Sequence, residues 1–167
     1  MHKRSQDVPA GTFFDLAPLH VVTTSSITYF SEKNPNSNFD LRRFRPNIVI
    51  ETTEEGLVEE QWIDGTLAIG AGLRVNVTLP TPRCVVVTLA HAPDLAVDLN
   101  TIRSTLKTNM LNVPGFGKFG CLGVYADVSF EGRIAIGDEV SFYPDESSRS
   151  DSVSARLRNQ IRTARRY

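Results

Sequence analysis

Residues 74–89 read RVNVTLPTPRCVVVTL, in which two β-branched runs flank a proline-rich segment. Alternating apolar residues predict a strand over Arg74–Thr78, and Val85–Leu89 predicts a second strand after Pro80 and Pro82 interrupt the first. Cys84 is therefore expected at the beginning of a strand, where its thiol is accessible. Arg83 beside it favours the thiolate, the form that reacts and ligates soft metals.

Further strands are expected along the chain, at residues 48–51, 67–69, 124–130 and 134–136. Gly, Pro, Asn and Asp separate these short runs, as is typical of a closed or nearly closed barrel. Two helices interrupt them. Hydroxyl residues predict that one helix begins near Thr24 and ends before Asn34. Apolar residues at helical spacing predict the other over residues 99–110, with Asp98 or Asn100 as its cap. The sequence thus predicts a mainly β fold with a few short helices.

Composition and charge fit one ordinary globular domain. The 167 residues are 41% hydrophobic and 22% charged, and the net charge of −1 gives no reason to expect nucleic acid or a membrane as a partner. No apolar run reaches the length of about 18 residues that a membrane helix needs, so a cytoplasmic location is expected. Two cysteines, Cys84 and Cys121, form no disulfide framework and are treated as separate thiols.

Five ordered segments resemble the MOSC domain, the module shared by the C-terminal part of molybdenum cofactor sulfurase and the amidoxime-reducing molybdenum enzymes. The resemblance covers most of the chain, from about Gly11 to about Phe142. The segments are GTFFDLAPLHVVTT at 11–24, RFRPNIVI at 43–50, WIDGTLAIG at 62–70, PTPRC at 80–84 and GRIAIGD at 132–138. It implies a MOSC-type β-barrel and a molybdenum-pyranopterin cofactor.

The resemblance also implies roles for single residues. Cys84 matches the cysteine that binds molybdenum in the amidoxime reductases, and is therefore the expected metal ligand and catalytic residue. Arg45 and Arg83 are expected to contact the cofactor, and Tyr125 matches a tyrosine at the pocket wall. The hydroxyl residues Thr23, Thr24 and Ser25 are expected to hold the cofactor's phosphate, because a helix N-terminus favours an anion.

Each of these residues also has a structural alternative. Free cysteine is commonly a buried small hydrophobe, and an aromatic residue in a strand is often part of the core. Cys121 is interpreted as structural. His20 and His91 stand alone and are interpreted as structural histidines. Glycines 115, 117 and 120 have the spacing of a dinucleotide fingerprint without its strand and helix, and the segment is interpreted as a mobile loop over the site.

The C-terminal segment differs in composition from the rest. Residues 144–167 contain six arginines and three acidic residues, so we expect residues 1–143 to form the MOSC domain and the remainder a separate tail. Few apolar residues are present to offset the entropy of ordering it, which favours a disordered extension or a short helix. Binding of an anionic partner is the alternative.

Two functions remain open from the sequence. The first is a molybdenum-dependent reductase of small N-hydroxylated compounds, in which a separate reductase or electron-transfer protein supplies electrons. The second is a non-catalytic cofactor or sulfur carrier that uses the Cys84 thiol. Family enzymes have a further N-terminal segment before the position of Gly11, so part of the pocket is expected from elsewhere. Unpaired strand edges then favour a homodimer.

Overall fold

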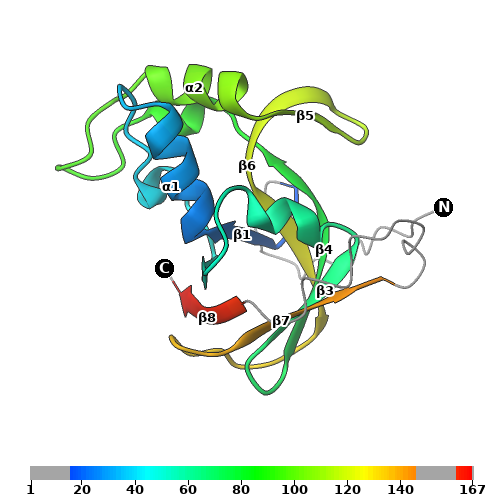
Figure 1. The fold of residues 1–167 in the computed structure, drawn as a ribbon. Helices are drawn as coiled ribbons and strands as arrows, with labels where there is room; N and C mark the ends of the chain where they lie inside the picture. Colours follow the sequence, from blue (N-terminus) through cyan, green and yellow to red (C-terminus); the bar gives the residue numbers. More distant parts are fainter. Residues whose placement is uncertain (1–15, 146–160, 167) are drawn as a thin grey trace, which may run out of the picture.

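The computed structural model describes residues 16–145 and 161–166. In these ranges eight strands form one sheet, and two short α-helices lie together at one end of it (Figure 1). The strands are β1 (Leu19–Thr23), β2 (Ile48–Thr52), β3 (Gly65–Ile69), β4 (Leu73–Pro82), β5 (Met110–Val113), β6 (Gly117–Phe130), β7 (Val140–Pro144) and β8 (Ile161–Arg166). The helices are α1 (Thr24–Lys33) and α2 (Asn100–Thr108), with 3-10 helices η1 (Leu41–Arg43), η2 (Val58–Trp62) and η3 (Val85–Thr88).

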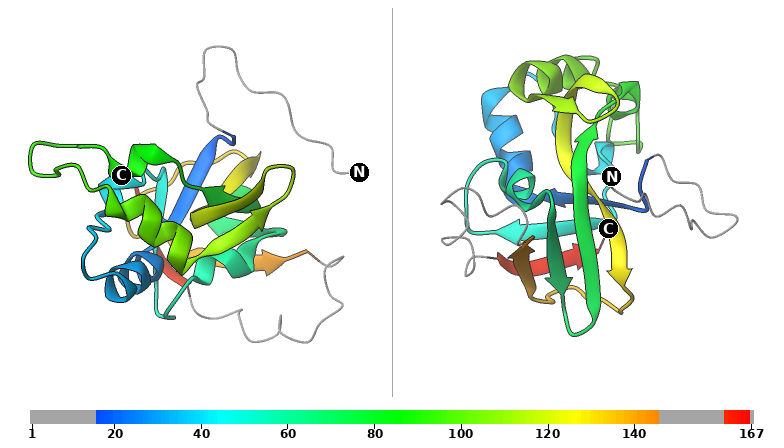
Figure 2. Two further views of the ribbon diagram at one scale, coloured as in Figure 1. Left: turned by 90° about the horizontal axis from the view of Figure 1, so that it is seen from above. Right: turned by 90° about the vertical axis from the view of Figure 1, so that its right-hand side faces the viewer.

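The sheet curves into a nearly closed barrel. Its strand order is β7-β3-β4-β6-β1-β2-β8, with β5 paired to β6, and all pairs are antiparallel except β1 with β2. The end strands β7 and β8 contact each other, which brings the two edges together (Figures 1 and 2). The prediction of a mainly β, barrel-shaped fold is confirmed.

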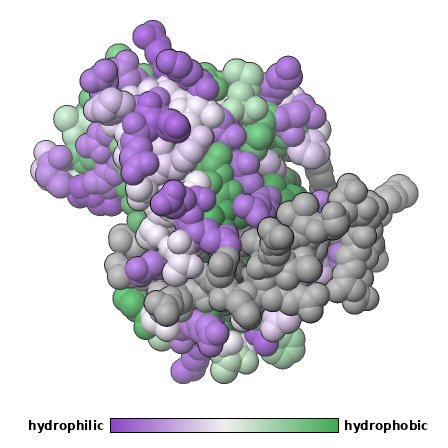
Figure 3. All heavy atoms as spheres, viewed as in Figure 1, coloured by the Kyte–Doolittle hydropathy of each residue, from purple (hydrophilic) through white to green (hydrophobic). Residues whose placement is uncertain are grey.

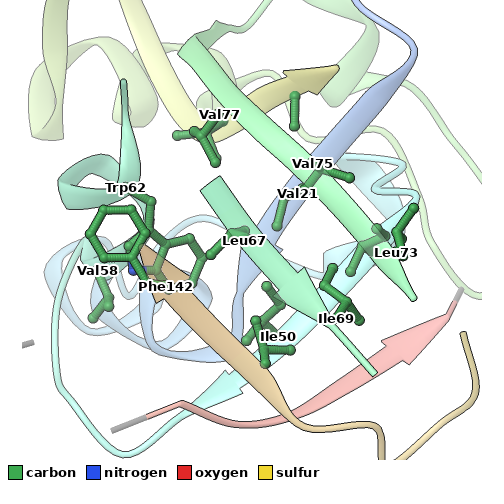
Figure 4. Packing of buried hydrophobic residues seen from close by; sticks show 14 residues of the cluster. Val21, Ile50, Val58, Trp62, Leu67, Ile69, Leu73, Val75, Val77 and Phe142 are labelled. Carbon is green, nitrogen blue, oxygen red and sulfur yellow. The ribbon is translucent and has the colours of Figure 1, made fainter. Parts of the chain in front are cut away.

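Apolar side chains fill the barrel. Trp62 from η2 and Phe142 from β7 point inward beside Leu67 of β3 (Figure 4), and Trp62 and Leu67 are fully buried. A second cluster, which includes Phe30, Phe39 and Phe44, lies under α1. Burying such side chains stabilises the fold by about 1.5–3 kcal/mol each. Outside the core, the face in Figure 3 is mostly hydrophilic over the two helices.

Helix α1 follows the prediction. Thr23 is the N-cap, and its Oγ1 accepts a hydrogen bond from the backbone N–H of Ser26 at 3.1 Å. The helix ends at Lys33, immediately before Asn34, as expected. No residue in its first turn is acidic, although the positive end of the helix dipole favours a negative charge there.

Helix α2 forms at the predicted place but buries the other face. Of the predicted apolar stripe, Ile102 is half-buried against the second cluster, but Leu99, Leu106 and Met110 are exposed, whereas Thr101 and Thr105 are fully buried. Their hydroxyl groups find partners locally, since Thr105 donates to the carbonyl of Thr101 at 2.8 Å and Thr101 donates to Asp98 at 3.0 Å. Small buried side chains allow the helix to approach β6, where a Cβ on Gly120 would lie 2.7 Å from the Leu106 backbone nitrogen. Asp98 Oδ1 accepts from the N–H of Asn100, but the N-cap position is Leu99, whose side chain makes no capping bond, so the prediction of Asp98 or Asn100 as the cap is wrong.

The prediction of a strand at Val85–Leu89 is wrong. Strand β4 continues through both prolines to Pro82, where its ladder with β6 is irregular, and η3 follows. Proline is tolerated at such irregularities because no regular N–H bond is lost. Two carbonyl groups of the segment, those of Val87 and Leu89, accept hydrogen bonds from the buried guanidinium of Arg43, as does the carbonyl of Ala96 further along the chain. These tertiary bonds fold the segment back and override the β propensity of the valines.

Two other segments also differ from prediction. Residues 134–136 form no strand, because Asp138 closes a turn by accepting a hydrogen bond from the N–H of Ala135 at 2.8 Å. Residues 117–120 are not a loop but the start of β6, which pairs with β5 as a hairpin around residues 114–116.

The C-terminal segment also contains a strand that was not expected. Residues Ile161–Arg166 form β8, which pairs antiparallel with β2. For this part a disordered extension or a helix is the wrong interpretation, because an open edge of β2 offers unpaired backbone groups to a strand. The rest of the expected helix, residues 155–160, lies outside the described residues.

Candidate functional site

Cys84 lies at the exposed end of β4. The N–H of Arg83 donates to the carbonyl of Gly120 on β6 at 2.9 Å, which keeps the chain on the sheet as far as Arg83. Cys84 comes next in an extended conformation and occupies the N-cap position of η3, where its side chain makes no capping hydrogen bond. Its side chain is exposed, so the thiol is accessible to a ligand.

The side chain of Arg83 connects this strand end to two other segments. Its Nη2 donates to the carbonyl of Phe44 at 3.0 Å, and its guanidinium lies over the Phe44 ring, 5.4 Å from the ring centroid. Its Nη1 is 3.4 Å from His20 Nε2 on β1. Burial, together with the positive charge of Arg83, lowers the pKa of His20 to about 3. His20 is therefore a neutral imidazole beside a guanidinium.

Arg45 is exposed in the loop that holds Arg83. It has a φ of 52°, the left-handed region, although Pro46 follows it. This conformation costs a non-glycine residue about 1–2 kcal/mol. Asn47 stabilises the loop by two bonds to His20: its N–H donates to the His20 carbonyl at 2.9 Å, and its Oδ1 accepts from the His20 N–H at 2.8 Å. Arg45 and Arg83 thus belong to adjoining segments connected through Phe44.

Tyr125 lies deeper in the same region. It pairs with His20 across β6 and β1, and the two rings meet edge to face with their centroids 6.0 Å apart. Tyr125 is only 4% exposed, so in this structure its ring packs against His20 as part of the core. Its role at a pocket wall stays a prediction.

The hydroxyl residues expected to hold phosphate form a second group, at the start of α1. Thr23 and Ser26 each donate a hydrogen bond of 2.6 Å to the same oxygen of Glu59, Oε2. Glu59 belongs to η2 and is only 1% exposed. It supplies the negative charge that the first turn of α1 lacks in its own sequence.

These bonds fix where the hydroxyl protons point. Because Thr23 has one hydroxyl proton and gives it to Glu59, Ser25 is the donor in the 3.0 Å contact between Ser25 and Thr23. Thr52 on β2 in turn donates to Ser25 at 2.9 Å. Thr52 Oγ1 also lies 3.3 Å from the carbonyl oxygen of Glu54, so its one proton has two acceptors within reach. The protons of Ser25 and Thr23 point inward, toward Glu59. Thr24 is half-buried outside this chain of bonds.

Cys121 has the properties of a structural residue. It is fully buried on β6, where it pairs with Pro82 of β4. Burial, with a further contribution from the carboxylate of Glu60, raises the pKa of its thiol to about 11. The thiolate is therefore unfavourable, which separates Cys121 chemically from the exposed Cys84.

The two groups fit different parts of a metal cofactor. Within residues 16–145 and 161–166, His, Cys, Asp and Glu side chains form no group of three that could hold a metal ion. Cys84 offers one accessible sulfur and is preceded in the chain by the cationic Arg83, which holds the loop that carries the exposed Arg45. The start of α1 offers backbone N–H groups to an anion. The roles of Cys84, Thr23, Thr24, Ser25, Arg45, Arg83 and Tyr125 stay predictions.

Three residues of the region were not expected from the sequence. His20 was interpreted as structural, which its burial supports, yet it contacts Arg83. Arg43 and Glu59 have no motif that indicates burial, because their partners come from other segments. A shallow hollow beside Arg43 contains none of the predicted site residues. It is lined by residues 35–38, 94, 96–98 and Arg43.

Comparison with known families supports the resemblance found in the sequence. The sequence model of the MOSC domain matches residues 10–141, which is most of the chain. No curated protein matches the chain significantly. None of the helices in the described ranges is long and apolar enough to cross a lipid bilayer. The chain belongs to the MOSC domain family, which is associated with molybdenum cofactor binding.

Proposed function

We propose that this MOSC domain binds the molybdenum-pyranopterin cofactor and reduces small N-hydroxylated compounds. The observation that carries the proposal is the exposed Cys84 thiol next to Arg83, whose guanidinium holds the loop bearing Arg45. A soft sulfur ligand next to one cationic side chain, with a second on the adjoining loop, suits a molybdenum ion with an anionic ligand.

Each residue has a distinct task in this proposal. Cys84 binds the metal, while Arg45 and Arg83 orient the pterin by planar hydrogen bonds. Neutral His20 fixes the position of Arg83 without adding a second positive charge. The ring of Tyr125 packs against His20 and holds it in place. Thr23, Thr24, Ser25 and the first N–H groups of α1 hold the phosphate.

The reaction needs both electrons and protons. An N-hydroxylated substrate takes two electrons and two protons, its N–O bond breaks, and the products are the reduced nitrogen compound and water. The bound cofactor supplies the two-electron redox chemistry. A separate electron-donor protein must then reduce the cofactor. We further propose that the protein acts in the cytoplasm and forms a homodimer.

The exposure of Cys84 also supports a second candidate function. An accessible thiol at a strand end can carry sulfur as a persulfide without any turnover. In that case the domain is a cofactor or sulfur carrier, and no substrate is reduced.

Metal analysis decides between these functions. The full chain is produced in a host that synthesises molybdenum cofactor, and bound molybdenum, bound pterin and persulfide on Cys84 are measured. Reduction of benzamidoxime with a chemical electron donor is assayed on the same sample. Stoichiometric molybdenum with turnover supports the reductase. Persulfide on Cys84 without molybdenum supports the carrier, and absence of both overturns the proposal.

A further inference from the structure

Glu59 is a buried carboxyl group that no step of the proposed reaction uses. It lies in η2 between the core residues Val58 and Trp62. Its Oε2 accepts two short hydrogen bonds, from Thr23 and Ser26, but among the described residues none donates to its other oxygen, Oε1. Burying a carboxylate with one oxygen unsatisfied is costly, so this carboxyl group is poised to take up a proton.

We propose that Glu59 couples anion binding to proton uptake: a dianion that binds at the first turn of α1 drives one proton onto Glu59. The inference rests on the proposed function in one respect, the placing of the cofactor's phosphate at this turn. It adds to that function a residue that controls phosphate binding.

The charges around Glu59 make this coupling effective near neutral pH. Burial raises the pKa of Glu59 to about 7, and the negative charge of Glu60 contributes to the rise. The hydroxyl groups of Thr23 and Ser26 act in the opposite direction without cancelling it. Strands β1 and β6 and helix α1 pack against η2. On the strands, His20 and Cys121 are buried and uncharged near neutral pH, and β6 also carries Lys118, Tyr125 and Asp127. Helix α1 has Tyr29, Glu32 and Lys33, of which Lys33 is in the last turn, at the end away from Glu59. Strand β3 carries no titratable side chain.

A bound dianion changes this balance in one direction. Its negative charge disfavours the ionised form of Glu59, so the pKa of Glu59 rises and more of it is protonated. By linkage, protonated Glu59 favours the dianion to the same extent. Binding is therefore strongest where Glu59 is already protonated, and it weakens as pH rises above 7.

Proton uptake also changes the direction of the hydroxyl chain. While Glu59 is ionised, Thr23 must donate to it, and Ser25 must donate to Thr23. Once Glu59 carries a proton, it can donate to Thr23 instead. Thr23 then donates to Ser25, and the Ser25 hydroxyl is released to donate to the bound anion. The same residues thus become phosphate donors only when Glu59 is protonated.

The test uses sulfate on the cofactor-free full chain, because sulfate stays a dianion at every pH used. Backbone amide shifts of Thr24 and Ser25 are followed by NMR as sulfate is added at pH 6.5 and pH 8. With the pKa of Glu59 at about 7, we expect the wild type to bind about fourfold to eightfold more weakly at pH 8. Glu59→Gln should differ by less than twofold between the two pH values. Glu60→Gln, the matched control, should keep most of the wild-type difference.

A second measurement needs no variant and stands if Glu59→Gln fails to fold. The carboxyl carbon of Glu59 is titrated by NMR with and without saturating sulfate, and the midpoint should rise by at least one pH unit. An unchanged midpoint, no sulfate binding at pH 6.5, or an equal pH dependence in Glu59→Gln would overturn the inference. Sulfate coupling without any cofactor binding would instead contradict only the proposed function.

Discussion

The end of β4 and the start of α1 use their polar groups in opposite ways. At the end of β4, the Cys84 thiol is exposed next to Arg83, and the loop that Arg83 holds carries the exposed Arg45. At the start of α1, the hydroxyl protons of Thr23 and Ser25 point inward toward buried Glu59. In the proposed function, a metal therefore meets an accessible thiol directly, whereas a phosphate at the start of α1 binds only after the hydrogen bonds there change. On this proposal, ligand binding at Cys84 depends on the exposure of the thiol, and anion binding at the start of α1 depends on the protonation of Glu59.

The largest expected effect concerns the two thiols. Cys84→Ala removes the accessible thiol, so we expect benzamidoxime reduction to fall to background, since the proposed protein ligand to the metal is lost. Cys121→Ala should keep most activity, because the pKa of that thiol is about 11 and it is buried. Activity and bound molybdenum are measured for both variants. Equal activity in wild type and Cys84→Ala would show that the end of β4 is not the metal site.

Gly123, next to His20, tests how tightly the residues that support the end of β4 are packed. Gly123 has a φ of 82°, and a Cβ there would lie 2.4 Å from His20 Nε2 and 2.7 Å from the carbonyl oxygen of Val21. We expect Gly123→Ala to destabilise the fold by about 4 kcal/mol, from the left-handed conformation and the overpacking together. Gly56→Ala is the control: its φ is 88° and its Cβ would meet nothing within 4 Å, so about 1 kcal/mol is expected. Urea unfolding compares them, and similar losses would contradict the packing argument.

Buried Glu59 at the start of α1 should make the free energy of unfolding depend on pH. The folded state raises the pKa of Glu59 from 4.5 to about 7, so between these values the folded protein binds more protons than the unfolded chain. Stability therefore falls as pH rises through this window, by up to about 3 kcal/mol. Glu59→Gln should remove this part of the pH dependence. Urea unfolding of both proteins between pH 4.5 and 8 checks it, and parallel curves would argue against a buried titrating Glu59.

The smallest expected effect separates strain from function in the Arg45 loop. Arg45→Gly relieves a left-handed backbone and should stabilise the fold by up to about 1 kcal/mol while weakening cofactor binding. Asp64→Gly is the matched control, because Asp64 has a φ of 63° in the turn before β3. It should gain similar stability and bind cofactor as the wild type does. Normal cofactor retention by Arg45→Gly would remove Arg45 from the site.

Local patterns predicted the barrel and helix α1 because the signals lie within each segment. The hydroxyl cap at Thr23 and the break before Asn34 are examples. The errors arise where distant groups decide the conformation. Arg43 folds the valine run into η3, and the close approach of Gly120 turns the threonine face of α2 inward. Nothing in the sequence around Arg43 or Gly120 indicates which distant residues they contact.

The candidate site shows the same division. Cys84 and Arg83 were found because they are adjacent in one motif. Glu59 was missed, since its partners Thr23 and Ser26 are more than thirty residues away in the sequence. Its burial depends on three segments that meet only in the fold.

X-ray absorption at the molybdenum edge tests the central claim most directly, because it counts the sulfur atoms bound to the metal. The account predicts three sulfurs in the cofactor-loaded wild type, two from the pterin and one from Cys84. Cys121→Ala should also show three. A count of two in the wild type, or a loss of one sulfur in Cys121→Ala, would contradict the assignment of Cys84 as the metal ligand.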